Sequence, residues 1–372
     1  MSRFRALWGL TAVACVLVGM AAMTGTAMAA TCAVKDGTAK FTGLQEAVTA
    51  AKAGDTLKVT GTCEGATVIE KNLTITGKAA ILKGGGPVSV VTIGREATVA
   101  ISGVTITEGQ GTLGTGECYC YEGTFGGGIY NKGTLKLSKS TVTKNSISGI
   151  SSEGGGIYNI DGTATIEKST VSENAVGGGG AGAGVGNASI APSRAVGTIT
   201  VVNSTFVKNN NVAIRSDGNH LTIKHSTFKE NSGPVIGTNN TEVLISGKSL
   251  ISGEFGQFEG PVVFSGGTAT IEKSTIEEIN NNHAKAGIYA KNGAAVTLIG
   301  ATVTKNGGAF SPGGGFYLTE GASLKTTKKS KVTGNTAEHG GGVFLTNTAG
   351  TVTEEKAGEI SGNTPDNLYT EP

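Results

Sequence analysis

Two consecutive stretches decide the fold of this chain: GGGIYNKGTLKLSKSTVTKN at 126–145 and GGGIYNIDGTATIEKSTVSEN at 154–174. Each begins with a glycine run and continues into short segments in which apolar and polar residues alternate. Alternation with a period of two is typical of a β-strand that turns one side inward, and glycine between such segments indicates turns. The pair therefore predicts a unit of short strands and tight turns, repeated in tandem.

The repeat extends in both directions from this pair. Two apolar residues recur at alternate places, as in Leu135 and Leu137, and a third apolar position follows in every copy. Members of this third position lie roughly 22 to 36 residues apart, the span of a solenoid coil. We expect them to form one inward column: Ile75, Ile106, Val142, Val171, Phe206, Phe228, Leu250 or Ile251, Ile276, Val303, Val332 and Ile360. Strands this short cannot bury a face alone, so the repeat predicts an all-β parallel β-helix of about eleven to twelve stacked coils.

Asparagine follows the third apolar position in seven copies. These residues are Asn145, Asn174, Asn209, Asn231, Asn306, Asn335 and Asn363. Asparagine tolerates left-handed backbone geometry at turns, and stacked side-chain amides can bond from one coil to the next. A row of ligand-binding amides is the alternative interpretation, and we favour the structural ladder.

The ends and interruptions of the repeat have their own patterns. Leu44, Ala47, Val48 and Ala51 have helical spacing, which predicts a helix over about 44–53 that plugs the first coil. Two segments, 110–125 and 175–197, are too long for turns and are expected to be loop insertions. Such insertions often gather on one face of a solenoid and bind ligands, or are simply tolerated mobile loops.

Residues 1–29 have the pattern of a signal peptide. Arg3 and Arg5 precede an apolar run over 6–23, and Ala-Met-Ala at 27–29 supplies the small residues of a cleavage site. An uncleaved membrane anchor is the alternative. We expect export, with residues 30–372 forming a single secreted domain and no membrane span after cleavage.

The charge of the exported chain is balanced. Two of the 30 Lys and Arg residues belong to the leader, so the remainder equals the 28 Asp and Glu residues. A neutral chain has no overall field to steer nucleic acid, anionic lipid or acidic polysaccharide. We therefore expect no nucleic-acid partner.

Four cysteines remain after export, and in an oxidising compartment their default state is the disulfide. We favour a bridge between Cys32 and Cys63, which would staple the beginning of the fold. Cys118 and Cys120 are close in sequence, so a strained bridge and a role as metal ligands both stay open. No histidine lies near them in sequence, and we expect no metal site and no cofactor.

The copies ending in Phe206-Val-Lys-Asn209 and Phe228-Lys-Glu-Asn231 resemble the FxxN half of polymorphic outer-membrane protein repeats. The glycine runs before Ile129, Ile157, Phe316 and Val343 resemble its GGAI half. More widely, residues 32–363 resemble secreted right-handed β-helices of the pectate-lyase-like superfamily. The resemblance implies a right-handed coil and, by association, adhesion or surface display. No C-terminal barrel segment follows Asn363 in this sequence, and two FxxN copies alone are literal, which departs from the outer-membrane family.

A polysaccharide lyase or glycoside hydrolase of this fold is the alternative function. Such chemistry needs clustered carboxylates for acid–base work or for a hard cation, and the five aspartates of the exported chain are scattered over different coils. The best remaining constellation is Arg215, Asp217, His220 and His225, within one coil and its turn. Charged groups on the solvated side of a strand are the competing interpretation.

Paired threonines, such as Thr141 with Thr143 and Thr302 with Thr304, resemble the flat array of ice-binding β-helices, but Val207, Lys229 and Glu277 interrupt it. The sequence thus favours a secreted, monomeric, non-catalytic β-helical protein for display, adhesion or glycan binding. Its expected partner is a cell-surface or extracellular glycan or protein.

Overall fold

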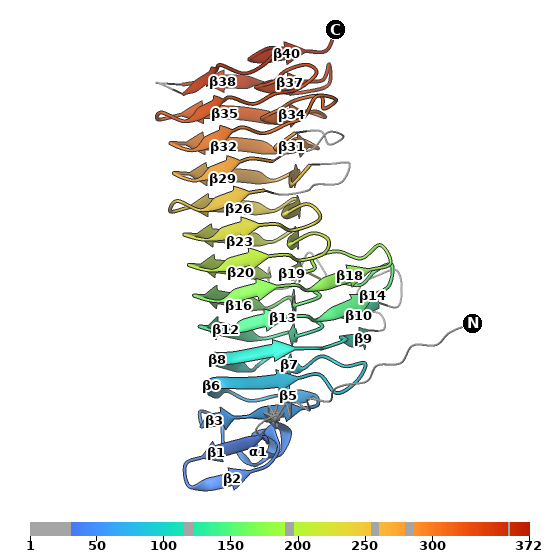
Figure 1. Ribbon diagram of the computed structural model, residues 1–372, viewed down its shortest axis with the longest axis vertical. Helices are drawn as coiled ribbons and strands as arrows, with labels where there is room; N and C mark the ends of the chain where they lie inside the picture. The colour runs from blue at the N-terminus through green and yellow to red at the C-terminus, as the bar shows by residue number, and fades with distance from the viewer. Residues whose placement is uncertain (1–30, 115–122, 190–196, 254–259, 280–285, 356–357) are drawn as a thin grey trace, which may run out of the picture.

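The computed structural model describes residues 31–114, 123–189, 197–253, 260–279, 286–355 and 358–372, and these form one rod of stacked coils (Figure 1). One coil contains three strands, for example β11 (Ile129–Asn131), β12 (Thr134–Ser138) and β13 (Thr141–Thr143). Each strand pairs in parallel with its counterpart in the next coil, so backbone hydrogen bonds run along the rod. The chain is a parallel β-helix with three faces.

The three faces are named here by their strands. The twelve-strand face is one sheet of β5 (Thr67–Ile69), β7 (Val91–Ile93), β11, β15 (Ile157–Ile160), β19 (Val185–Ala188), β22 (Ile214–Asp217), β25 (Ile236–Asn239), β28 (Val262–Ser265), β31 (Ile288–Lys291), β34 (Phe316–Leu318), β37 (Val343–Leu345) and β40 (Leu368–Thr370). The five-residue face contains β3 (Thr56–Thr60), β12, β16 (Thr163–Glu167), β20 (Thr198–Val202), β23 (His220–Lys224), β26 (Glu242–Ser246), β29 (Thr268–Glu272), β32 (Ala295–Ile299), β35 (Ser323–Thr327) and the shorter β38 (Val352–Glu354). The three-residue face contains β4 (Thr62–Glu64), β13, β17 (Thr170–Ser172), β21 (Thr205–Val207), β24 (Thr227–Lys229), β27 (Leu250–Ser252), β30 (Thr275–Glu277), β33 (Thr302–Thr304), β36 (Lys331–Thr333) and β39 (Glu359–Ser361). Two long strands, β6 (Leu73–Lys83) and β8 (Thr98–Thr107), run through both of the last two faces.

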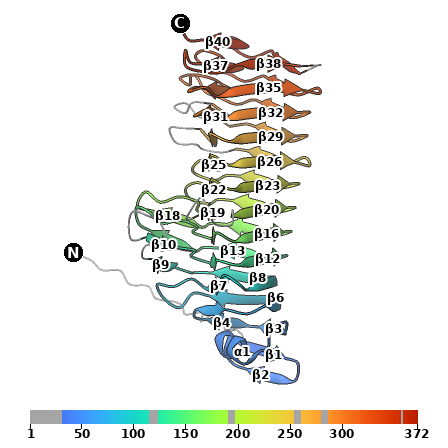
Figure 2. The same ribbon diagram turned by 180° about the vertical axis from the view of Figure 1, so that it is seen from behind.

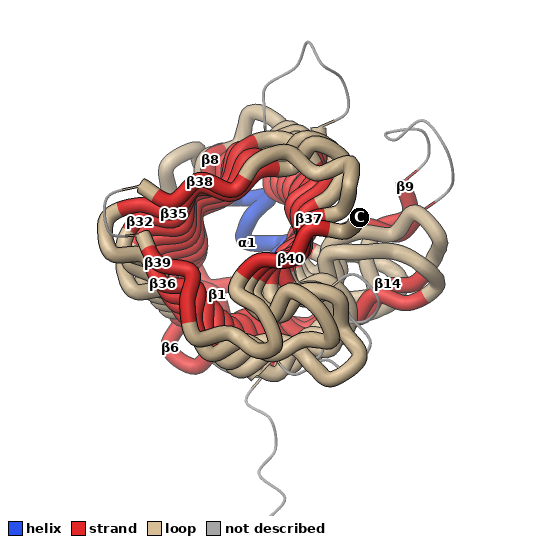
Figure 3. The backbone as a smooth tube through the Cα atoms, turned by 90° about the horizontal axis from the view of Figure 1, so that it is seen from above, coloured by secondary structure: helices blue, strands red, loops and turns tan. Residues whose placement is uncertain are grey.

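The first coil is closed by the predicted helix and disulfide. Helix α1 (Leu44–Ala50) lies across the end of the interior, as the view along the rod shows (Figure 3), and it buries Leu44, Ala47 and Val48. The helix ends before residue 53 because Ala51 is already extended. Strands β1 (Ala33–Asp36) and β2 (Ala39–Phe41) form an antiparallel pair beside it, and Cys32 is bonded to Cys63. This end therefore presents no bare coil edge.

The third apolar position forms an inward column with one member wrongly assigned. Val142 pairs with Ile106 and Val171, and Ile251, not Leu250, pairs with Phe228 and Ile276. Ile75 pairs instead with Ile101 on the five-residue face, and Leu82 takes the expected place beside Ile106. The misassignment arises because β6 crosses two faces, so its Leu-Thr-Ile-Thr segment resembles the end of a coil while lying at its middle.

All three corners of the coil place residues in the left-handed region, and at two of them a buried serine or asparagine follows on most rungs. We call the corner between the five-residue and three-residue faces the serine corner, after the buried Ser140, Ser169, Ser204, Ser226, Ser249, Ser274 and Ser330. In it, the backbone N–H of one serine donates to the hydroxyl of the next, as from Ser169 to Ser204 at 3.1 Å. These hydroxyls satisfy backbone groups that would otherwise be buried without partners.

The asparagine corner lies between the three-residue and twelve-strand faces and is lined by the seven predicted asparagines. Their amides bond in two runs: Asn145 to Asn174 to Asn209 to Asn231 at 2.9–3.1 Å, and Asn306 to Asn335 to Asn363 at 2.9–3.0 Å. A second amide ladder, which the sequence analysis missed, joins Asn131, Asn159 and Asn187 at the end of the twelve-strand face. Its signal was present as the Asn of the repeated Ile-Tyr-Asn.

The two expected loop insertions are partly regular. Strands β9 (Thr112–Gly114) and β10 (Gly123–Phe125) form an antiparallel pair, while Cys118 and Cys120 lie outside the described residues. The Gly/Ala tract of 175–197 contains β18 (Ala175–Gly177), which pairs with β14 (Ser146–Ser148), and β19, a full rung of the twelve-strand face. Val185-Gly-Asn187 is a third copy of Ile-Tyr-Asn, hidden because glycine replaces tyrosine. Strands β9, β10 and β18 project from one side of the rod (Figure 2).

Candidate functional site: a pocket on the twelve-strand face

An outward column of aromatic rings runs along the twelve-strand face and is interrupted in its middle. Tyr130 and Tyr158 lie together with Phe125 at one end, with ring centres 4.9–6.5 Å apart. Tyr289, Tyr317, Phe344 and Tyr369 continue the column at the other end, with successive centres 5.2–5.4 Å apart. Between these groups the column positions are Gly186, Arg215, Gly237 and Val263. The aromatic ladder therefore has a gap of four rungs.

The two glycines of the gap have different surroundings. A Cβ placed on Gly186 would lie 3.1 Å from the Cβ of Glu153, so the Glu153 side chain already covers that rung. A Cβ on Gly237 would have only ordinary contacts, at 3.4 Å to Val212 and 3.7 Å to Arg215. Space is thus left open over Gly237 and not over Gly186.

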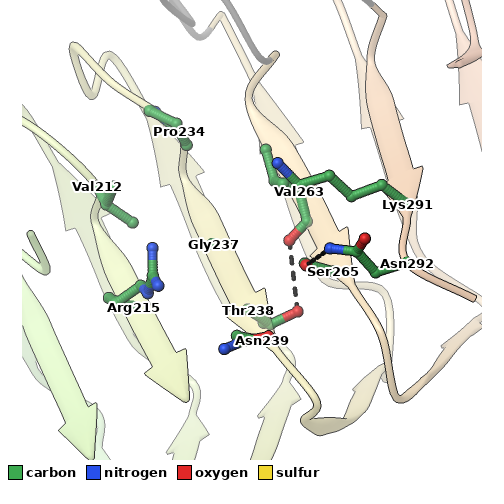
Figure 4. A pocket seen from close by; sticks show the side chains of 10 residues that line it. All are labelled: Val212, Arg215, Pro234, Gly237, Thr238, Asn239, Val263, Ser265, Lys291 and Asn292. Carbon is green, nitrogen blue, oxygen red and sulfur yellow. Dashed lines mark hydrogen bonds between the residues drawn. The ribbon is translucent and has the colours of Figure 1, made fainter. Parts of the chain in front are cut away.

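A pocket of about 380 Å³ lies over Gly237 (Figure 4). Its walls are the side chains of Arg215 and Val263 on the rungs before and after, with Val212 and Pro234 along one side. The opposite side is polar and is formed by Thr238, Asn239, Ser265, Lys291 and Asn292. The pocket thus combines three apolar side chains with a larger set of polar ones, and convergent polar groups of this kind fix the orientation of a small ligand.

Arg215 is held in place by Asp217, two residues along the same strand. The Nε–H of Arg215 donates to both carboxylate oxygens of Asp217, at 2.9 and 3.0 Å. Both side chains point outward because residues two apart on a strand share a face. The pair is partly exposed, at 36% for Arg215 and 28% for Asp217, and its planar guanidinium faces the open rung as a fixed wall. On the far side of the pocket the amide of Asn292 donates to the hydroxyl of Ser265 at 2.8 Å.

Glu153 adds a second carboxyl group near this pair. The pKa of Glu153 is raised to about 7, chiefly by burial and also by the negative charge of Asp217, while the charge of Arg215 opposes the rise. Its Oε2 is buried and accepts no hydrogen bond from the described residues. Sequence reasoning missed Glu153 because it precedes the second glycine run, and only the stacking of coils brings it beside Arg215 and Asp217.

The four residues of the predicted constellation do not form one site. Arg215 and Asp217 lie together on the twelve-strand face, whereas His220 begins β23 on the five-residue face and bonds through Nδ1 to Glu242 at 2.9 Å. His225 is exposed at the serine corner in the left-handed region. The four side chains are distributed over two faces and a corner, because the chain turns a corner after Asp217 and another after Lys224.

Within the described ranges, no three His, Cys, Asp or Glu side chains gather as metal ligands. The same ranges contain no helix that is long and apolar enough to cross a bilayer.

The stacked coils define the class of protein, a parallel β-helix, and the pocket lies on one of its flat faces. The chain belongs to the family described as the right handed beta helix region, whose sequence model matches residues 159–364, more than half of the chain. Its coils are accordingly right-handed, as the sequence resemblance implied. Comparisons with curated proteins and with solved structures gave no significant match.

Proposed function

We propose that the exported protein is a non-catalytic glycan-binding rod, and that one sugar ring binds over Gly237. The observation that carries this proposal is the open rung between Arg215 and Val263 in an otherwise filled outward column. A pyranose ring has two flat faces with C–H groups and a rim of hydroxyls. Such a ring fits between a guanidinium plane and an apolar side chain, with its rim toward the polar side of the pocket.

The polar side of the pocket supplies the hydrogen bonds that a sugar rim needs. Asn239 and Asn292 are exposed amides, each able to donate and accept, and Lys291 adds an ammonium donor. Asn239 and Lys291 lie at the ends of strands β25 and β31, and Asn292 follows β31 directly, so the sheet positions these groups before the ligand arrives. The disulfide between Cys32 and Cys63 supports export, because such bonds persist in oxidising compartments.

Binding to a glycan array tests this proposal. The substitution Gly237→Leu would fill the open rung, and the backbone there accepts a side chain. We expect the wild-type protein to bind a defined set of glycans and Gly237→Leu to lose that binding by at least tenfold. Thr92→Leu is the matched control, because Thr92 occupies the same outward column several rungs away and its replacement should leave binding unchanged. Equal binding by both variants would sink the proposal.

A polysaccharide hydrolase is the second candidate, and one observation favours it. Glu153 is a buried carboxyl with a pKa of about 7, and its charge interacts with that of Asp217, which is paired with Arg215. A carboxyl that keeps its proton near neutral pH beside a second carboxyl is a feature of glycosidase active sites. The same array hits are therefore incubated with the protein while new reducing ends and unsaturated products are followed. We expect none; product formation that Asp217→Asn and Glu153→Gln abolish would replace the binding proposal with the hydrolase.

A further inference from the structure

Charge is distributed unequally between the serine corner and the asparagine corner of the coil. Both corners hold one exposed residue with positive φ on nearly every rung. At the serine corner these residues are Lys139, Lys168, Asn203, His225, Lys248, Lys273, Gly300 and Lys328. At the asparagine corner they are Lys144, Glu173, Lys208, Glu230, Gly253, Glu278, Lys305 and Gly334. The first row contains cations and neutral residues, whereas the second mixes both signs.

The fold does not require lysine at the serine corner. The corner is built by the buried serine that directly follows six of these residues and by backbone bonds between rungs, such as Lys139 N–H to the carbonyl of Glu167 at 3.0 Å. Ala301 takes the place of serine after Gly300, and Ser330 follows Lys328 by two residues. A side chain other than glycine in the left-handed region costs about 1–2 kcal/mol, and glycine or asparagine relieves that cost. Five of the eight rungs nevertheless hold lysine, which points to a use for its charge.

Neighbouring charges leave this corner positive. At the asparagine corner lysine pairs with glutamate of the adjacent rung, in Lys208–Glu230 at 3.7 Å and Lys305–Glu278 at 3.4 Å. At the serine corner, Glu167 pairs with Lys168 at 3.0 Å and Glu272 with Lys273 at 3.2 Å. Exposed Lys139, Lys248 and Lys328 add to the row without a carboxylate within 4 Å among the described residues.

The positive charge of the serine corner lowers the pKa of one neighbouring carboxyl group, that of Glu167. The pKa of the Glu167 carboxyl is lowered by a hydrogen bond from Lys168, by the charge of Lys168, and further by Lys136 and Lys139. The neutrality of residues 30–372 therefore hides a segregation of charge, and the expectation that the exported chain has no field for a polyanion does not hold along this edge.

We propose that the serine corner is a binding edge for a linear anionic polysaccharide. Rungs are spaced by about 4.8 Å, so Lys139 to Lys328 spans roughly 34 Å along a straight edge. A chain with regularly spaced anions can pair with such a row, and each contact releases counterions. This edge is independent of the Gly237 pocket, which lies on the twelve-strand face.

Two other polyanions fit the edge less well. Proteins that bind single-stranded nucleic acid stack bases on aromatic rings, and the positive-φ positions of this corner hold no ring except His225. Membrane-surface binding combines charge with inserted apolar side chains. Among the described residues the large exposed apolar side chains are Val68, Leu113, Ile150, Phe310 and Leu368, and none belongs to this corner.

Binding to immobilised heparin, with neutral dextran as reference, tests the edge. The test variant combines Lys139→Gln, Lys248→Gln and Lys328→Gln. The matched control combines Lys144→Gln, Lys208→Gln and Lys305→Gln, which removes the same charge from the same backbone geometry at the asparagine corner. Thermal melting of both variants verifies that they are folded.

We expect the wild-type protein to bind heparin and not dextran, and the serine-corner variant to bind at least tenfold more weakly. Its slope of log affinity against log salt concentration should fall by about two, since each lost contact contributes roughly 0.7–0.9. The control should change less than twofold. Equal losses in the two variants, absence of heparin binding at low salt, or tighter binding to a single-stranded oligonucleotide or to phosphatidylserine vesicles would each overturn the proposal.

Discussion

Single side chains decide where the twelve-strand face is open. Gly186 and Gly237 occupy equivalent positions, yet Glu153 fills the first rung, while no side chain of the described residues fills the second. The sequence shows both glycines but not this difference, because Glu153 comes from a loop of another coil. Arg215 and Asp217 are two residues apart on one strand, so their pairing was predictable from the sequence. The Glu153 carboxyl beside them was not predictable, because it comes from another coil.

The Glu153 carboxyl makes stability depend on pH. Its pKa is about 7 in the folded protein and 4.5 as a free side chain. Between these values the unfolded chain has released the proton that the folded protein retains, so rising pH favours unfolding. We expect the free energy of unfolding to fall by roughly 3 kcal/mol from pH 4.5 to pH 7 and then to level off.

Urea unfolding across this pH range measures the effect. Glu153→Gln should remove the decline between pH 4.5 and pH 7, whereas Glu173→Gln, at an exposed turn, should keep it. Parallel pH profiles for the wild-type protein and Glu153→Gln would show that this carboxyl is not the source.

At the scale of strands, the period-two pattern predicted most inward residues correctly. Leu135, Leu137 and Val142 are fully buried, and their counterparts are buried in every later coil except the last, where Val352 is half-buried and Glu354 is exposed. The register is fixed because a single face of each strand is buried. The pattern failed where a strand did not match one face: β6 spans two faces, and β19 has glycine in place of tyrosine. Both failures concern context that only stacking supplies.

The asparagine ladder should contribute strongly to stability. Asn209 is fully buried, donates to Val171 and Asn231, and accepts from the backbone and side chain of Asn174. Asn209→Ala leaves several of these groups without partners, at about 1–3 kcal/mol each. We expect a loss of at least roughly 3 kcal/mol by urea unfolding. Asn210→Ala, at the exposed neighbour, should cost under about 1 kcal/mol, and equal losses would contradict the ladder.

At the scale of the whole molecule, each coil contacts its neighbours, so stability is local along the rod. The Cys32–Cys63 bond closes a segment of 31 residues at the capped end. Removing it with Cys32→Ser and Cys63→Ser should destabilise that end by about 3–4 kcal/mol. Hydrogen exchange should show lost protection in β1 to β6 and unchanged protection in β20 to β33. Uniform loss along the chain would show that the rod unfolds as one unit.

The fold could therefore be predicted from the sequence, whereas the pocket over Gly237 largely could not. Repetition reveals which residues point inward, since every coil repeats the same constraint. Pockets and charged edges depend on what differs between coils, such as one missing tyrosine or the sign of a turn residue. The side chains that surround such a residue can be identified only when the register between neighbouring coils is known.

The proposal that a sugar ring binds over Gly237 is best tested by a crystal structure of the protein with a glycan selected on the array. We expect electron density for one sugar ring over Gly237, flanked by Arg215 and Val263, with hydroxyls bonded to Asn239 or Asn292. Density for the glycan on another face, with the rung over Gly237 still open, would contradict it.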